Sequence, residues 1–254
     1  MKSARLVSLA TVVLLLLGWE AVSELEWLSP MFLPSPSRVL HQFVVLSRDG
    51  YAGATLWEHA GTSLLRILCG FAVAASAAIP IGLLMGTNRW IKGALDPVIE
   101  FYWPLPPLAY LPLMIIWIGI DEAAKVTLLG MAMFAPICLA AQAGVRSVPI
   151  ERIHAAQSLG ASRRQLFFYI LLPSALPEIM TGIRISIGTG WATLVAAELI
   201  AATEGIGFMI MSAANFLATD IVFAGIITIA VCALASAAAA RWAERLLVPW
   251  KGKS

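Results

Sequence analysis

The stretch that decides the organisation of this chain is His154-Ala155-Ala156-Gln157-Ser158-Leu159-Gly160, followed after nine residues by Ile170-Leu171-Leu172-Pro173. This segment is polar, and it lies between two long apolar runs. Its small residues Ala155, Ala156 and Gly160 would allow the backbone of another protein to approach closely. The segment is therefore predicted to be a contact site for a partner outside the membrane.

The local signals in this segment predict a helix, a turn and a second helix. Pro149 favours the first turn of a helix, and Gly160 favours the left-handed conformation that ends one. Ser162 and Gln165 have the spacing of a capping box, which predicts the start of the second helix. Pro173 predicts its end.

Composition predicts an all-α polytopic membrane protein. Hydrophobic residues make up 60% of the chain, charged residues only 13%, and the mean hydropathy is +0.86. A soluble domain is typically about half apolar and about a quarter charged, and a membrane-spanning helix needs about 20 apolar residues. About six transmembrane helices are predicted, at residues 6–25, 62–86, 98–118, 126–145, 176–201 and 221–241.

The predicted organisation has three parts. Residues 1–60 form an N-terminal transmembrane helix and a periplasmic amphipathic segment, residues 61–245 form the transmembrane domain with a cytosolic loop at 146–173, and residues 246–254 form a cytosolic tail. The first apolar run also resembles a secretory signal peptide, because Lys2 and Arg5 precede it. We expect it to be retained as a helix.

Two shorter segments are predicted on the side opposite the 146–173 loop. Residues 38–46 have the pattern of an amphipathic helix, which could lie in the membrane interface or pack against its own bundle. Residues 203–220 contain Gly205 and Gly207 before an apolar turn and lack lysine and arginine. This composition predicts a re-entrant or surface helix that faces outward.

Lysine and arginine are distributed unevenly along the chain. Because cytosolic loops carry an excess of these residues, both termini and the 146–173 loop are predicted to be cytosolic. The residues assigned to this side are Lys2, Arg5, Arg89, Lys92, Arg146, Arg152, Arg163, Arg164, Arg241, Arg245, Lys251 and Lys253. Those assigned on or near the other side are Arg38, Arg48, Arg66 and Lys125.

No pattern in the sequence is typical of catalysis. The three cysteines lie in different apolar segments, and the three histidines are widely separated. The sequence has no Walker A motif and no hydrolase or zinc-protease motif. We therefore expect no catalytic residue, no metal and no cofactor on this chain, and any ATP must be hydrolysed by another polypeptide.

Two predicted spans carry features that a purely structural helix does not need. The third contains Trp103-Pro104-Leu105-Pro106-Pro107, and lipid tolerates the lost backbone donors only where protein or water satisfies the freed carbonyls. A bent helix beside a pathway is therefore expected at Trp103, Pro106 and Pro107. The fifth contains Thr189, Trp191 and Thr193 among glycines, which suits either helix packing or a polar pathway lining.

Glu198 is the remaining pathway candidate. It lies deep in the fifth predicted span, on the outward side. An ionisable residue at this depth costs free energy and indicates a role or a partner. A hydrogen-bonded structural role and a gate role both stay open.

The 146–173 loop resembles the cytosolic "EAA" loop of permease subunits in ATP-binding-cassette (ABC) importers, which docks into a groove of the ATPase subunit. The resemblance implies a set of ATPase-coupling residues: His154, Ala155, Ala156, Ser158, Leu159, Gly160, Ala161, Arg163, Arg164 and Pro173. His154 stands where the family has an acid, so a salt bridge from that acid is not carried over. An ordinary basic loop that only sets topology is the alternative.

Five further strings resemble the nitrate, sulfonate and taurine importers, in particular the taurine permease branch. They are Leu95-Asp96-Pro97, residues 106–113, Leu176-Pro177-Glu178, residues 190–198 and residues 216–220. The resemblance implies a type I ABC importer permease fold and the import of taurine or a related sulfonate. Another small anion, such as nitrate or an alkanesulfonate, is the alternative, and a secondary transporter is a more distant one.

The resemblance also implies partners and a location. The permease would form a homodimer with two ATP-binding subunits, which hold ATP and Mg, and would receive substrate from a periplasmic solute-binding protein. The assembly would lie in the lipid bilayer of the bacterial inner membrane. No nucleic-acid partner is expected.

Overall fold

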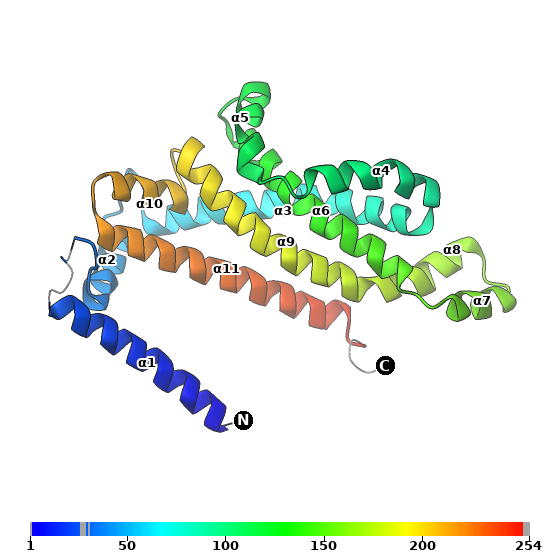
Figure 1. Cartoon of the computed structure of the whole chain (residues 1–254), viewed down its shortest axis with the longest axis horizontal. Coiled ribbons are helices and arrows are strands. Elements are labelled where there is room, and N and C mark those ends of the chain that lie inside the picture. Colours follow the sequence, from blue (N-terminus) through cyan, green and yellow to red (C-terminus); the bar gives the residue numbers. More distant parts are fainter. Residues whose placement is uncertain (1, 26–28, 30, 251–254) are drawn as a thin grey trace. The chain divides into compact units, whose positions relative to one another are not determined.

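The computed structural model of the chain describes residues 2–25, 29 and 31–250. All regular elements in these ranges are helices, and Figure 1 shows their order. They are α1 (Lys2–Glu24), α2 (Pro36–Arg48), α3 (Leu56–Thr87), α4 (Arg89–Tyr102), α5 (Pro107–Ile118), α6 (Glu122–Arg146), α7 (Ile150–Ser158), α8 (Arg163–Leu166), a π-helical turn (Phe167–Leu171), α9 (Leu172–Ala201), α10 (Ile206–Asn215) and α11 (Thr219–Leu247).

The chain forms two compact units. Unit 1 comprises Met1–Ser63 and Glu198–Val231, and unit 2 comprises Leu64–Ala197 and Cys232–Ser254. Three long helices, α3, α9 and α11, each begin in one unit and end in the other.

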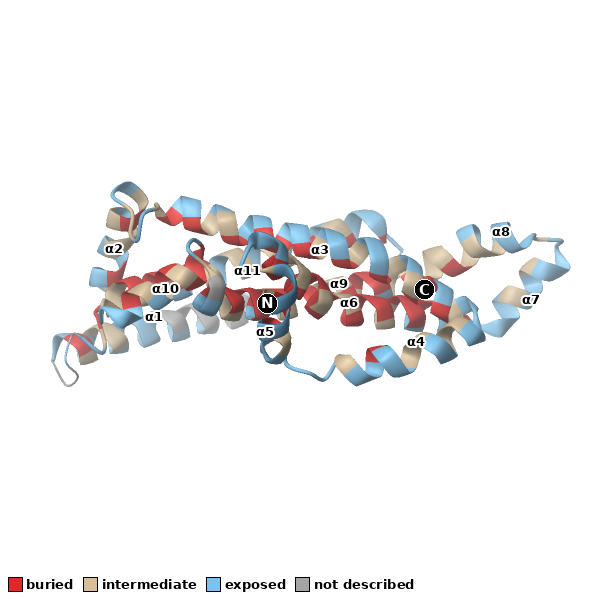
Figure 2. Ribbon diagram, turned by 90° about the horizontal axis from the view of Figure 1, so that it is seen from above, coloured by how far each residue is buried: buried red, intermediate tan, exposed pale blue. Residues whose placement is uncertain are grey.

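The central helix of unit 2 is α6. In the most apolar 18 residues of α6, 72% of the residues are buried, whereas the fraction is 33% or less in the three other long apolar segments. Figure 2 shows the buried residues of α6 in red. Glycines on the neighbouring helices permit this packing. A Cβ on Gly82 of α3 would lie 2.7 Å from the Ala141 Cβ, and one on Gly182 of α9 would lie 2.9 Å from the Pro136 carbonyl oxygen. Small residues thus let the three backbones approach closely.

Within unit 1, polar contacts join α2 to the end of α1. The Trp19 indole N–H donates to the Pro34 carbonyl oxygen (3.0 Å), and the Glu20 carboxylate accepts from the Ser37 hydroxyl (2.9 Å). Ser35 caps α2 by accepting from the Arg38 N–H (3.3 Å). The amphipathic segment predicted at 38–46 is therefore part of a capped helix.

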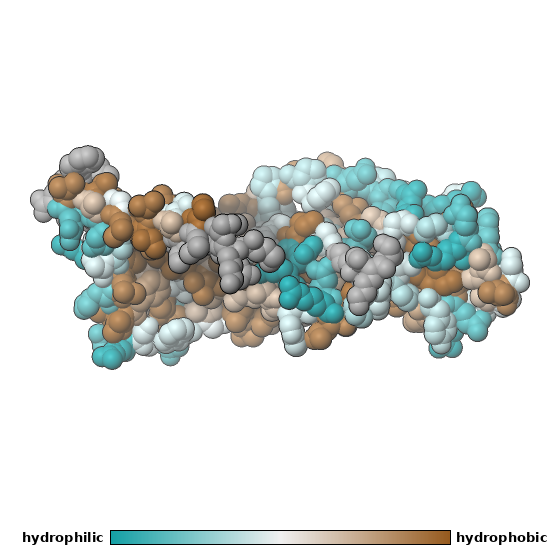
Figure 3. All heavy atoms as spheres, turned by 90° about the horizontal axis from the view of Figure 1, so that it is seen from below, coloured by the Kyte–Doolittle hydropathy of each residue, from teal (hydrophilic) through white to brown (hydrophobic). Residues whose placement is uncertain are grey.

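Four helical segments in the described part of the chain are long and apolar enough to cross a membrane: Leu56–Thr87, Glu122–Arg146, Arg163–Ile200 and Thr219–Leu247. The helices α4 and α5 are long and apolar enough to cross a membrane only when the two are counted as one span. Figure 3 shows apolar side chains over much of one face, as contact with lipid requires. The remaining prediction, a span at 6–25, coincides with α1, several of whose side chains lie outside the described residues, so that span stays a prediction.

The third predicted span, 98–118, consists of two helices, α4 and α5, joined at a bend. The chain bends by 101° between α4 and α5, at the proline-rich run where a bend was expected. Helix α4 begins at Arg89, before the third predicted span. The Asn88 side-chain oxygen accepts from the Trp90 N–H (2.9 Å) and thereby caps this helix.

Candidate coupling loop and transport pathway

The polar segment at residues 146–173 forms a helical hairpin in unit 2, with α7 and α8 as its arms (Figure 1). Gly160 has φ +82°, the left-handed conformation predicted for it. Its N–H donates to the Gln157 carbonyl oxygen (2.9 Å), and the Ala161 N–H donates to that of Ala156 (3.0 Å). These two bonds define a Schellman motif. The predicted turn is confirmed.

The start of α8 also agrees with the prediction. The Ser162 hydroxyl accepts from the Gln165 N–H (3.3 Å), and the Gln165 side chain accepts from the Ser162 N–H (2.8 Å). This is the capping box that the sequence predicts. Two opposed helix ends therefore meet within a few residues and fix the direction of the hairpin.

Pro173 does not end the second helix, so this prediction is wrong. The chain stays helical from Arg163 to Ile200. Immediately before the proline, the backbone widens into the π-helical turn Phe167–Leu171, and the Leu172 N–H donates to the Phe167 carbonyl oxygen. A π turn changes the hydrogen-bond register, which relieves the clash between a proline ring and the preceding turn.

The tip of the hairpin is open to a partner. Leu159 is 89% exposed, and a Cβ added to Gly160 would meet no atom of this chain within 4 Å. The Arg164 guanidinium lies 5.9 Å from the Phe168 ring centroid. Of the other predicted coupling residues, His154, Ala155, Ser158 and Arg163 are exposed, whereas Ala156, Ala161 and Pro173 are partly buried.

The break between α4 and α5 contains three of the predicted pathway residues. Trp103 and Pro106 are exposed, and Pro107 begins α5. Pro104 supplies no N–H, so the Glu100 carbonyl four residues earlier loses its helical donor, whereas Pro107 stands at the first position of α5, where an N–H has no partner within the helix. Such backbone at membrane depth has to be covered by protein or by water.

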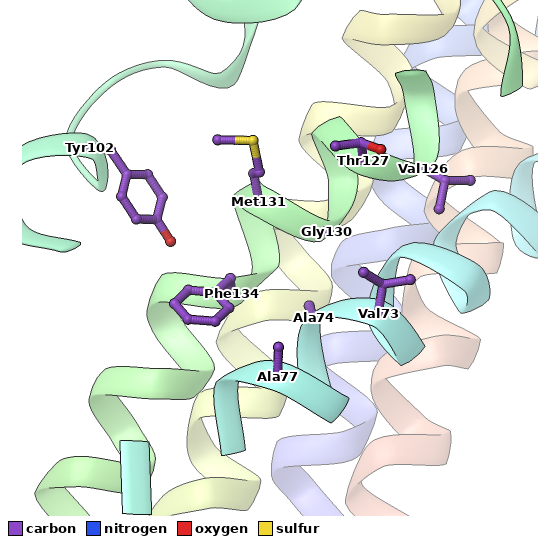
Figure 4. A pocket seen from close by; sticks show the side chains of 9 residues that line it. All are labelled: Val73, Ala74, Ala77, Tyr102, Val126, Thr127, Gly130, Met131 and Phe134. Atoms are coloured by element: carbon purple, nitrogen blue, oxygen red, sulfur yellow. The ribbon is translucent and has the colours of Figure 1, made fainter. Parts of the chain in front are cut away.

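A cavity of about 320 Å³ lies close to this break, between α3, α4 and α6 (Figure 4). Its polar side chains are the Tyr102 phenol and the Thr127 hydroxyl. The other lining residues are apolar or glycine: Val73, Ala74, Ala77, Val126, Gly130, Met131 and Phe134. This cavity was not predicted from the sequence. The small residues of α3 and α6 were the available signal, but they do not show which helices meet.

The candidates on α9 have hydrogen-bond partners within the protein. The Thr189 hydroxyl donates to the Ile185 carbonyl oxygen (3.2 Å), and the Thr193 hydroxyl donates to that of Thr189 (2.9 Å). The Trp191 indole N–H donates to the Ser236 hydroxyl of α11 (3.3 Å). Trp191 and Thr193 are buried and Thr189 is partly buried. Thr189, Trp191 and Thr193 therefore lie together on α9, and none of them lines the cavity between α3, α4 and α6.

Glu198 lies in unit 1 and is 1% exposed. Its carboxylate accepts from the Ser63 hydroxyl (2.8 Å) and from the Gly207 N–H (2.9 Å). Ser63 was not singled out in the sequence. The spacing of His59 and Ser63, four residues apart at the start of an apolar helix, was a signal that could have found this polar face.

Three charged residues meet at the start of α6. The Arg66 guanidinium of α3 binds the Glu122 carboxylate through Nε (2.5 Å) and Nη2 (2.6 Å), and the Lys125 ammonium binds it at 2.8 Å. Both basic side chains are almost fully buried. Among the described residues, no group of three or more His, Cys, Asp or Glu side chains could hold a metal ion.

The comparisons with known proteins agree with the predicted family. The chain is 51% identical to the taurine transport system permease protein TauC of Escherichia coli (strain K12), over 97% of this chain and 90% of that protein. It is 39% identical to the putative aliphatic sulfonates transport permease protein SsuC of the same strain, over 91% of this chain and 87% of that protein. Identity to the nitrate import permease protein NrtB of Synechocystis sp. (strain ATCC 27184 / PCC 6803 / Kazusa) is 31%, over 95% and 89% of the two chains.

A solved structure shows the same fold. A chain of the MetNI methionine ABC transporter, in an inward facing conformation, aligns with a TM-score of 0.64 at 16% identity, over 76% of this chain and 95% of that one. The predicted type I ABC importer permease fold is therefore confirmed. Residues 78–249 match the family described as "Binding-protein-dependent transport system inner membrane component". The chain belongs to this family of multi-pass inner-membrane transport permeases.

Proposed function

We propose that this permease imports taurine or a related sulfonate, driven by a separate ATPase subunit. The similarity to the taurine permease and to the putative aliphatic sulfonates permease supports this substrate class. The similarity to the nitrate permease keeps a smaller anion as the second candidate. The observation that carries the coupling role is the exposed, doubly capped hairpin α7–α8.

The proposed coupling loop, residues 146–173, receives motion from the ATPase. Leu159 would enter an apolar pocket of that subunit, while Ala155 and Gly160 leave room for its backbone. Arg163 and Arg164 flank this contact and would bind acidic groups. ATP and Mg bind to the ATPase, and this chain supplies no catalytic residue.

Two copies of the permease are proposed to enclose the pathway. The break at Trp103 and Pro106 supports this arrangement, because exposed irregular backbone is not stable against lipid. A second copy and a water-filled pathway would satisfy the carbonyls that the prolines leave free. Thr189, Trp191, Thr193 and Glu198 remain pathway candidates, and the hydrogen bonds of their side chains would have to rearrange during transport.

The proposed topology follows from the charge distribution. Both termini and the hairpin lie in the cytosol, whereas α2 and α10 face the periplasm and the solute-binding protein. Residues 1–60 form the N-terminal helix and amphipathic segment, residues 61–245 the transporting domain and residues 246–254 the tail. The excess of Lys and Arg in the hairpin and near both termini supports this orientation.

The test is uptake by vesicles that contain this chain, its ATPase and its binding protein. Radiolabelled taurine should accumulate only with ATP, and excess unlabelled taurine should compete more effectively than nitrate. Stronger competition by longer alkanesulfonates would shift the assignment within the sulfonate class. Competition by nitrate alone would contradict the sulfonate assignment, and accumulation without ATP would contradict the importer assignment.

A further inference from the structure

The backbone amides of Gly205, the N-cap of α10, and of the first two residues of α10 bond to buried side chains of unit 1. The N–H groups of Gly205, Ile206 and Gly207 donate, in this order, to His59 Nδ1 (3.1 Å), Ser63 Oγ (2.9 Å) and Glu198 Oε2 (2.9 Å). His59 and Ser63 lie on α3, and Glu198 lies near the end of α9. Three of the donors that a helix start leaves unsatisfied are therefore satisfied by other helices.

This cluster is shielded from solvent. His59 and Ser63 are 0% exposed and Glu198 is 1% exposed. The Ser63 hydroxyl accepts from Ile206 and donates to the Glu198 carboxylate (2.8 Å), so the groups form one network. Loss of a bond in a buried network is costly, because water does not replace the missing partner.

The geometry defines the protonation state of His59. Since Nδ1 accepts from the Gly205 N–H, the ring proton lies on Nε2, which donates to the Tyr51 carbonyl oxygen (3.0 Å). A doubly protonated ring has donors at both nitrogens and no acceptor. Protonation of His59 would therefore place an N–H against the N–H of Gly205 and break this bond.

The segments joined by this network carry ionisable residues close in sequence to the bonded positions: Tyr51 in the preceding turn, Glu58 on α3, Glu198 at the end of α9 and Glu204 before α10. Residues 203–220 contain no lysine or arginine. Glu58 is exposed and accepts from the Thr55 hydroxyl (2.8 Å). Because a doubly protonated ring has no acceptor for the Gly205 N–H, uptake of a proton at Nδ1 is coupled to opening of the cluster.

The opposite side of α10 makes an apolar contact that a proton does not change. A Cβ added to Gly225 of α11 would lie 2.5 Å from Ile210 Cγ1 and 3.1 Å from Met209 Cε. The two helices thus pack closely within unit 1. When the polar bonds break, α10 can remain on α11 while its N-terminus leaves α3 and α9.

We propose that His59, Ser63 and Glu198 form a proton-sensitive latch for the N-terminus of α10. The latch is closed when His59 Nδ1 carries no proton and accepts from the Gly205 N–H. Uptake of a proton by His59 opens it. Since the closed state requires Nδ1 to be free of a proton, the latch is most stable at high pH and is lost as the pH falls.

The experiment measures hydrogen exchange of residues 203–209 in the full chain in lipid nanodiscs, as protection relative to the intrinsic rate at each pH. In the wild type, protection should fall about tenfold or more from about pH 8 to about pH 5.5. His59→Gln should stay protected at both pH values. Its side-chain oxygen can accept from Gly205, its nitrogen can donate to Tyr51, and it does not titrate.

The control is His41→Gln, since His41 is an exposed histidine of α2. This variant should keep the wild-type pH dependence. Constant wild-type protection, or an unchanged pH dependence in His59→Gln, would overturn the proposal. If residues 203–209 exchange fast at both pH values in His59→Gln, the Ser63→Ala variant decides between the outcomes. Faster exchange than in the wild type at about pH 8 supports the latch. Wild-type protection in Ser63→Ala overturns it.

Discussion

The N–H of Ala161 donates to the carbonyl oxygen of Ala156 at 3.0 Å, and this bond closes the turn between α7 and α8. It places Leu159 and Gly160 at the tip of the hairpin, where both are exposed. The shape of the proposed coupling surface is thus set by backbone bonds within the hairpin. A substitution there can alter docking without disturbing the apolar bundle.

Cysteine labelling tests the orientation of the membrane protein. In a chain whose native cysteines are replaced by alanine, Arg48→Cys should react with an impermeant thiol reagent added outside whole cells. Arg163→Cys should react only after the membrane is permeabilised, because the hairpin is predicted to be cytosolic. Both positions are exposed in the structure. Labelling of position 163 in intact cells would contradict the predicted orientation and place the hairpin outside the cytosol.

Removal of the Glu122 carboxylate should strongly destabilise unit 2. Glu122→Ala leaves two buried basic groups, those of Arg66 and Lys125, without this shared acid. The expected loss of unfolding free energy is about 1–3 kcal/mol, because the Glu122 side chain is itself 58% exposed. Unfolding in detergent measures it.

Asp121→Ala is the matched control for Glu122→Ala. Asp121 is exposed and its side chain makes no capping hydrogen bond. Its replacement should change stability by about 0.5 kcal/mol or less. Equal effects of the two substitutions would refute the role given to the Arg66–Glu122–Lys125 cluster.

Two glycines of α9 should respond differently to alanine. In Gly182→Ala, the added Cβ would overlap the Ala140 Cβ and lie 2.9 Å from the Pro136 carbonyl oxygen. This overpacking should cost about 1–3 kcal/mol. In Gly188→Ala, the Cβ meets no atom within 4 Å, so stability should be unchanged or higher. Thermal unfolding of the two variants, side by side, tests this packing; equal melting temperatures would contradict it.

Features set by neighbouring residues could be predicted from the sequence. The left-handed Gly160 and the Ser162–Gln165 capping box depend on residues within one turn, and both are present. The prediction that Pro173 ends the helix was wrong because the π-helical turn before it shifts the hydrogen-bond register, so the helix continues although the proline supplies no N–H. A single proline does not reveal how the preceding turn is wound.

Features that join distant helices could not be predicted. Arg184 of α9 pairs with Glu244 of α11 (3.3 Å), a partner that the sequence analysis did not name. In a membrane helix, lipid-facing and core-facing residues are both apolar, so hydrophobic periodicity does not show which sides meet. The cavity beside Tyr102 was missed for the same reason.

The most direct test of the coupling function is recovery of the ATPase with Gly160→Glu. The residue would be held at positive φ, at a cost of about 1–2 kcal/mol, and its side chain would fill the docking gap without touching this chain. Gly53→Glu is the control, because Gly53 also has positive φ (+90°) and open space, on the predicted periplasmic side.

At matched membrane levels, we expect Gly160→Glu to lower co-purification of the ATPase about tenfold or more, which corresponds to about 1.4 kcal/mol of binding free energy or more, and to abolish ATP-dependent uptake. Gly53→Glu should retain normal ATPase recovery. Normal ATPase recovery together with normal uptake in Gly160→Glu would contradict the assignment of the α7–α8 hairpin as the coupling loop.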